Sequence, residues 1–256
     1  MKAETETGGR IAGQRPAFYA LRPGGWRDLV TLLHPPYTLW HLSYVAIGAA
    51  AAPQVHGDRL AAALGAFFLA VGVSAHALDE LHGRPLGTRL SRRALVVLAS
   101  LGLGGALAIG VAGVFTVSAS LIPFVLAGGF LVLAYNLELF GGRFHTEFWF
   151  AAAWGGFPAL TAWWSNALGV ADFRAALAGA AVTLGCFWLT LAQRRLSTPV
   201  RELRRRTESV EGSQRLSDGE VRELSLAVIA APLDGALRAL SFGLPLLAVA
   251  LVAVRI

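Results

Sequence analysis

Long apolar runs separated by short polar stretches dominate this chain of 256 residues. Apolar runs cover about residues 37–52, 60–81, 94–115, 119–140, 148–166 and 175–191, and a last run extends from 224 to 256. Most are close to the roughly 20 residues that a helix needs to cross a bilayer. The pattern predicts an all-α, polytopic transmembrane helical bundle of about seven spans. Because the last run is too long for one ordinary span, eight spans remain an alternative.

The polar stretches divide the chain into a tail and one membrane domain. Residues 1–15 are mostly Gly, Glu, Thr and Arg, and we expect them to form a disordered cytoplasmic tail. Apolar and charged residues then mix over 18–34, which indicates an interfacial amphipathic helix or a simple extension of the first span. Residues 1–34 are therefore expected to precede a single transmembrane domain at 35–256, with a charged cytoplasmic loop at about 194–223.

Composition supports membrane insertion and narrows the class of partner. The chain is 55% hydrophobic and 15% charged, with a mean hydropathy of +0.57. Its net charge of +6 comes almost entirely from arginine, since Lys2 is the only lysine. The arginines lie between apolar runs, where the positive-inside rule accounts for them, and this argues against nucleic-acid binding. Cys186 is the single cysteine and excludes an intramolecular disulfide.

The same arginines predict an orientation in the membrane. Arginine-rich loops follow the second, fourth and sixth apolar runs, and alternation of sides then places the N-terminus in the cytoplasm. No charged, apolar and small-residue succession opens the chain, so we expect no cleavable signal peptide. The sequence thus predicts an integral protein of a prokaryotic inner membrane, in which the polar clusters after these three runs converge on one cytoplasmic cavity.

The first cluster closes the second apolar run. His76, Asp79 and Glu80 stand at positions i, i+3 and i+4, so a helix would place them on one face, and His82 follows within two residues. Two adjacent carboxylates suit Mg²⁺, which keeps several waters and takes the rest of its ligands from substrate phosphate. We therefore expect Asp79 and Glu80 to hold a metal beside a phosphate-bearing ligand.

Two further clusters follow the fourth and sixth runs. Histidine is a ligand for Fe, Zn or Mn, so a transition-metal site is an alternative to magnesium. Arginine can hold a diphosphate oxygen through its planar fork. The candidate metal ligands are His76, Asp79, Glu80, His82, Glu138, His145 and Glu147, the candidate catalytic residues are Asp79, Glu80, Tyr135 and Asn136, and the candidate substrate-binding residues are Arg84, Arg143, Gln193, Arg194 and Arg195.

Several short stretches resemble one known family. The run Ala75-His76-Ala77-Leu78-Asp79-Glu80, then Gly83-Arg84-Pro85-Leu86 and Leu90-Ser91-Arg92-Arg93-Ala94, is similar to the first aspartate-rich motif and the following loop of the UbiA superfamily of intramembrane prenyltransferases. The resemblance covers about residues 35–206. The paired aspartates that the family carries after the sixth span are not matched, and Gln193-Arg194-Arg195 stand in that region.

The resemblance implies a helical bundle around a lipid-accessible cavity, with Mg²⁺ and basic residues holding an isoprenyl diphosphate at its cytoplasmic mouth. Its implied activity is metal-assisted transfer of an isoprenyl group from a diphosphate to a lipophilic acceptor among membrane lipids. Two alternatives stay open. One is a membrane metalloenzyme that acts on a lipid through a His, Glu and Asp site, and the other is a non-catalytic lipid-binding or assembly subunit with a protein partner.

Overall fold

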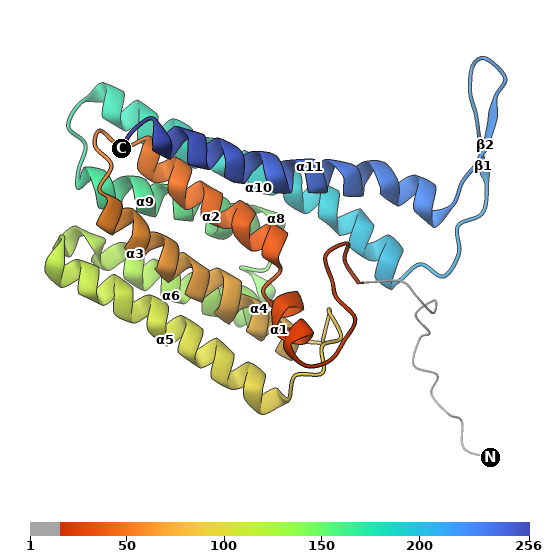
Figure 1. The fold of residues 1–256 in the computed structure, drawn as a ribbon, viewed down its shortest axis with the longest axis horizontal. Helices are drawn as coiled ribbons and strands as arrows, with labels where there is room; N and C mark the ends of the chain where they lie inside the picture. The colour runs from red at the N-terminus through yellow and green to blue at the C-terminus, as the bar shows by residue number, and fades with distance from the viewer. Residues whose placement is uncertain (1–15) are drawn as a thin grey trace.

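Every long apolar run of the sequence forms a helical segment in the structure, a computed structural model that describes residues 16–256 (Figure 1). The expected tail at 1–15 lies outside the described residues. The helices are α1 (Trp26–Leu32), α2 (Pro35–Ala50), α3 (Gly57–Phe67), α4 (His76–Leu81), α5 (Arg92–Thr116), α6 (Ile122–Asn136), α7 (Leu139–Gly142), α8 (Glu147–Ala151), α9 (Phe157–Ala167), α10 (Phe173–Arg205) and α11 (Leu226–Ala253).

Local sequence signals explain where these helices begin. Pro35 and Pro36 occupy the first turn of α2, where a missing N–H costs no hydrogen bond. The Ser91 hydroxyl accepts a hydrogen bond from the Ala94 N–H at the start of α5, and the Asp172 carboxylate accepts one from the Ala175 N–H at the start of α10. Each cap satisfies an N–H that has no partner within its helix.

Two π-helical turns interrupt the α-helical geometry. The element η1 (Phe68–Ala75) joins α3 to α4, and η3 (Ala152–Gly156) joins α8 to α9. A short 3₁₀ turn, η2 (Ala119–Leu121), leads into α6. A π-turn adds a residue to the helical repeat and so changes the direction in which the following side chains point. Both π-turns lie next to the polar cavity described below.

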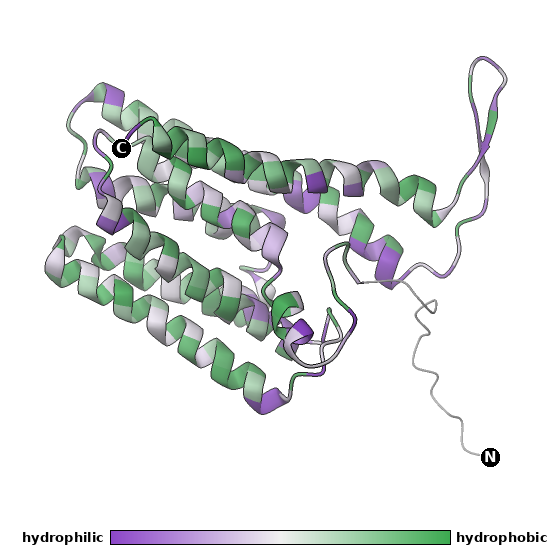
Figure 2. Ribbon diagram, in the orientation of Figure 1, coloured by the Kyte–Doolittle hydropathy of each residue, from purple (hydrophilic) through white to green (hydrophobic). Residues whose placement is uncertain are grey.

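Five helical segments are long and apolar enough to cross a membrane, which supports an integral membrane protein. They are Gly57–Leu81, Arg92–Thr116, Ala119–Asn136, Phe173–Arg205 and Leu226–Ala253. Large apolar side chains on them face outward, as Phe115 and Phe242 do with exposed fractions of 84% and 73%. Apolar positions cover the middle of the bundle and hydrophilic ones gather at its ends (Figure 2). Such an outer surface suits lipid rather than water.

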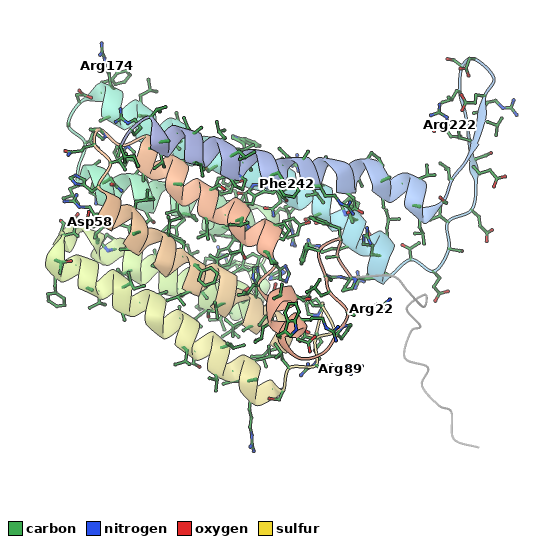
Figure 3. The ribbon with its side chains drawn as sticks, viewed as in Figure 1. Arg22, Asp58, Arg89, Arg174, Arg222 and Phe242 are labelled. Atoms are coloured by element: carbon green, nitrogen blue, oxygen red, sulfur yellow. The ribbon has the colours of Figure 1, made fainter. Side chains whose placement is uncertain are left out.

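Packing places α2 inside the bundle. It lies against α11 on one side and α9 on the other, while α10 packs against α11, α8, η3 and α9. In the other half of the bundle, α3 and η1 pack against α5, and η1 and α5 pack against α6. Charged Asp58 and Arg174 mark one end, Arg22 and Arg89 mark the other, and Phe242 lies between them (Figure 3).

The structure differs from the expected or alternative segment boundaries at three places. The stretch 18–34 is helical only over α1, because Gly24 and Gly25 adopt positive φ angles of 130° and 60° before it. The charged stretch expected to be a loop at 194–223 begins as helix, since α10 continues to Arg205. Residues 226–253 form the single helix α11 of 28 residues, so the structure offers no eighth span there.

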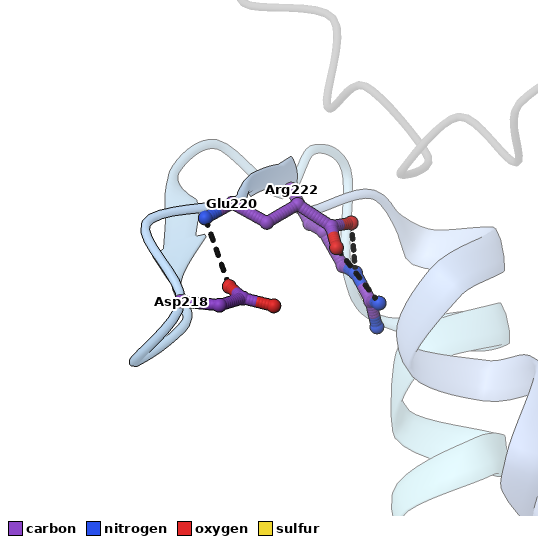
Figure 4. A network of polar contacts seen from close by, with 3 residues as sticks. All are labelled: Asp218, Glu220 and Arg222. Atoms are coloured by element: carbon purple, nitrogen blue, oxygen red, sulfur yellow. Dashed lines mark hydrogen bonds and ion pairs between the residues drawn. The ribbon is translucent and has the colours of Figure 1, made fainter.

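Between α10 and α11 the chain forms a small exposed hairpin. Strands β1 (Ser213–Arg215) and β2 (Val221–Glu223) pair antiparallel and extend away from the bundle (Figure 1). In the turn, the Asp218 carboxylate accepts a hydrogen bond from the Glu220 N–H at 3.0 Å, and Glu220 pairs with Arg222 at 2.7 Å (Figure 4). These charges stabilise one another locally and lie outside the cavity.

Candidate functional site

A polar cavity of about 490 Å³ opens at the end of the bundle that carries α1. Side chains from α2, α4, α6, α8 and α10 line it, and residues 16–19 cover part of it. Of the predicted site residues, nine line this cavity: His76, Asp79, His82, Tyr135, Asn136, Glu138, His145, Gln193 and Arg194. The three polar clusters of the sequence therefore meet in one place.

Glu80 is a predicted metal ligand that the structure places elsewhere. Its side chain is fully buried and is not among the residues that line the cavity. One carboxylate oxygen accepts a hydrogen bond from the Leu86 N–H at 3.0 Å, and the other accepts from the N–H and the hydroxyl of Thr88 at 2.8 and 2.9 Å. Both oxygens thus hold the loop between α4 and α5 in place.

Four more predicted site residues also lie off the cavity. Arg84 donates to the backbone carbonyls of Thr88 and Leu90 at 2.9 and 3.0 Å, so it braces the same loop as Glu80. Arg195 and Glu147 form an exposed ion pair at 3.8 Å on the outer face of α10. Arg143 is exposed in the turn before α8. These side chains do not face a ligand in the cavity.

Two stacked histidines form one wall of the cavity. The rings of His34 and His76 lie 4.1 Å apart and nearly parallel, and the Nδ1–H of His76 donates to the Gly72 carbonyl at 3.1 Å. Tyr19 hydrogen-bonds His34 at 2.6 Å and closes the wall from the N-terminal side. Burial, together with the charge of His76 and of nearby arginines, lowers the pKa of His34 well below its usual range. His34 is therefore neutral at pH 7.

A second aromatic group also lines the cavity. Tyr135 stacks on His145 with ring centroids 4.5 Å apart and meets Trp154 edge to face at 5.6 Å. His145 lies 4.0 Å from the Glu138 carboxylate. Tyr135 is only 4% exposed, yet its hydroxyl has no hydrogen-bond partner among the described residues. A buried hydroxyl of this kind is expected to pair with a ligand or water.

The sequence reading missed the arginines that α10 adds to the cavity. Arg201 and Arg205 lie seven and eleven residues after Arg194, so all three share one face of the helix, and Arg206 also reaches the cavity. This spacing is present in the sequence, but it indicates a shared face only if the segment after residue 194 is helical, and a loop was expected there. Other lining residues that were not predicted as site residues are Tyr19, His34, Tyr37, His41, Ser197, Thr198, Glu202 and Asp234.

Two of the four predicted carboxylate ligands, Glu80 and Glu147, are engaged outside the cavity. Mg²⁺ requires several oxygen ligands in octahedral geometry. Glu80 uses both of its oxygens on the loop, Glu147 pairs with Arg195, and Asp234 pairs with Arg204. Within residues 16–256, no group of three His, Cys, Asp or Glu side chains is arranged to hold a metal ion. The magnesium and transition-metal sites stay predictions from the sequence, and Asp79 and Glu138 are the predicted carboxylates that line the cavity.

An apolar groove of about 140 Å³ adjoins the polar cavity. Residues of α3, α5 and α6 line most of it, among them the small residues Ala66, Ala106 and Gly129. Val71 and Trp154 line both the groove and the cavity. The groove and the cavity therefore lie on either side of, or next to, the same two side chains.

Comparison with protein-family models, curated proteins and solved structures found no match for this chain. Any function must therefore be argued from the geometry of the cavity and groove.

Proposed function

We propose that this protein is a UbiA-like intramembrane enzyme that transfers an isoprenyl group from a diphosphate to a lipophilic acceptor. The observation that carries the proposal is the junction at Val71 and Trp154, where an arginine-lined polar cavity meets an apolar groove. An isoprenyl diphosphate has the same division into a highly charged head and an apolar tail. The resemblance of residues 75–94 to the first motif and following loop of the UbiA superfamily is the sequence argument for the same activity.

The proposed orientation places the cavity at the cytoplasmic face of an inner membrane. The cavity end carries Arg22, Arg27, Arg84, Arg89, Arg92, Arg93 and Arg143 besides the arginines of α10, whereas Arg59, Arg174 and Arg255 are the described arginines of the opposite end. The excess of arginine at the cavity end supports a cytoplasmic location. In this arrangement α2 and the α8 to α9 segment complete seven spans with the five long apolar helices.

The proposed reaction begins with cleavage of the bond between the first isoprenyl carbon and the diphosphate oxygen. The bonding electron pair leaves with the diphosphate, whose new charge the guanidinium groups of α10 stabilise. The allylic cation that remains lies against the faces of Tyr135 and Trp154, which attract positive charge. A nucleophilic atom of the acceptor bonds to the cation, and the resulting acidic adduct loses a proton to the Asp79 carboxylate.

The full-length protein in lipid nanodiscs provides the test of this activity. Geranyl, farnesyl and geranylgeranyl diphosphates are each supplied with lipophilic phenols as acceptors, and the prenylated product and released diphosphate are measured. Asp79→Asn should lower the rate about a hundredfold or more, the usual contribution of a positioned proton acceptor. Asp218→Asn in the exposed hairpin is the matched control. Diphosphate probes that bind without turnover would favour the non-catalytic lipid-binding alternative.

The groove makes a second prediction, on chain length. Ala66→Phe should weaken binding of a geranylgeranyl chain at least about tenfold relative to a geranyl chain, because each CH₂ that loses its apolar contact costs about 0.8 kcal/mol. Ala61→Phe is the control, since Ala61 is exposed on the same helix and does not line the groove. Affinities of the two S-thiolodiphosphate analogues give the comparison. An equal loss for both chains would contradict a tail site in the groove.

A further inference from the structure

We infer that the guanidinium groups of α10 bind the diphosphate directly, in the role that a carboxylate-held divalent cation has in the resembling family. This inference rests on the proposed function, because it concerns the same cavity and the same head group. It departs from the expectation of a resident magnesium ion and names the residues that replace it.

The first support is the placement of the arginines. Arg194, Arg201 and Arg205 follow one face of α10 at intervals of seven and four residues, and all three are half-buried in the cavity wall. The guanidinium of Arg194 lies 5.1 Å from the centre of the Phe150 ring, which holds it in place through the face of the ring. Arg201 is oriented by a hydrogen bond to the Thr198 hydroxyl at 3.2 Å.

The second support is the charge balance of the wall. Neither Arg194 nor Arg201 is in an ion pair with any residue of the described chain, and the Nε of Arg194 is buried there without a hydrogen-bond partner. Asp79, Glu138 and Glu202 also line the cavity, but none of them lies within ion-pair distance of Arg194 or Arg201 among the described residues. Both guanidinium groups therefore keep charge and N–H donors that favour an anionic ligand. Diphosphate fits, because its paired oxygens match the planar fork of arginine.

The third support is that two of the nearby acidic residues already bind other groups of the protein. Asp234, which also lines the cavity, is neutralised by Arg204, and Glu80 is turned into the loop. Asp79 is the acidic residue that α4 contributes to the cavity. A divalent cation beside Arg194 and Arg201 would be repelled by both guanidinium groups, which opposes its binding.

Two buried polar atoms complete the proposed head-group site. The Tyr135 hydroxyl and the Oε1 of Gln193 both belong to residues that line the cavity and are less than 5% exposed, and neither atom has a partner within residues 16–256. The tyrosine can donate to a phosphate oxygen. The glutamine oxygen accepts only from an N–H or O–H group, so it suits the hydroxyl of an acceptor rather than the diphosphate itself.

The test measures binding of two probes, inorganic diphosphate and geranylgeranyl S-thiolodiphosphate, to the full-length protein in nanodiscs by calorimetry. Each titration is run in excess EDTA and again in saturating Mg²⁺. Affinity should agree within about threefold between the two conditions. Arg194→Gln and Arg201→Gln should each weaken binding about tenfold or more in EDTA, as loss of a charged hydrogen bond predicts. Arg195→Gln, one residue away on the outer face, should change affinity by less than about twofold.

The outcomes separate the inference from the proposed function. If the lipid analogue binds only in Mg²⁺, and binds equally well to both arginine variants, the inference is overturned but the proposed function is not. If neither probe binds, in EDTA or in Mg²⁺, the proposed function itself is overturned. Arg201→Lys is a control for misfolding, because lysine keeps the positive charge but lacks the planar guanidinium group. This variant should bind with an affinity between those of the wild type and Arg201→Gln.

Discussion

Replacing Glu80 by alanine is expected to lower the free energy of unfolding by about 3 kcal/mol or more. The carboxylate accepts three hydrogen bonds from Leu86 and Thr88 in a fully buried position. Alanine would leave the two backbone N–H groups buried without acceptors, and each such group costs about 1–3 kcal/mol. Glu80→Gln should cost less, because the remaining amide oxygen can still accept from Thr88.

The measurement is denaturant or thermal unfolding of the detergent-solubilised protein, with Glu147→Ala as the control. Glu147 is half-exposed and pairs with Arg195, so its loss should change stability by less than about 1 kcal/mol. Stability should fall equally with and without Mg²⁺. A Glu80 variant that unfolds like the wild type but loses a magnesium-dependent activity would return Glu80 to the metal-ligand role predicted from the sequence.

Replacing Gly48 by alanine should be as damaging, for a different reason. Gly48 lies where α2 meets α9, and a Cβ atom there would stand 2.2 Å from the carbonyl oxygen of Ala159 and 2.8 Å from its Cα. Both neighbours are backbone atoms of a packed helix, so the two helices would have to separate. We expect the free energy of unfolding to fall by about 3 kcal/mol or more, within the range of severe overpacking.

Gly235→Ala is the matched control for this prediction. It is another glycine inside a long helix, α11, but a Cβ atom there has no neighbour within 4 Å. Alanine should stabilise that helix by up to about 1 kcal/mol through its higher helix propensity. The measurement is a comparison of the unfolding midpoints of Gly48→Ala and Gly235→Ala under the same conditions. Equal midpoints would mean that α2 and α9 approach less closely than the structure describes.

The helices of the bundle were largely predictable because each depends on its own residues. The expected run at 94–115 became Arg92–Thr116, and that at 148–166 became residues 147–167. A run of apolar residues long enough to cross a bilayer must satisfy its backbone hydrogen bonds internally, so it has little alternative to a helix. The errors lie at 18–34 and 194–205, where polar residues leave the choice between helix and loop to packing.

The location of the candidate site could be predicted from the sequence, but the set of residues that line it could be predicted only in part. Convergence of three polar clusters at one end followed from the alternation of spans, and nine predicted residues line the cavity. The sequence did not show which of two adjacent residues faces the cavity. Asp79 and Glu80 are adjacent, but successive helical residues point about 100° apart, so one carboxylate reaches the cavity and the other reaches the loop.

The sequence by itself determined that this is an all-helical chain with an apolar exterior and polar clusters at the ends of alternate runs, because length and hydropathy are properties of each segment alone. Tertiary structure decided the rest. The continuation of α10 to Arg205, the turn of Glu80 into its loop and the junction of cavity and groove at Trp154 all depend on contacts between segments far apart in the chain. No local pattern encodes such contacts, because they arise only when helices pack.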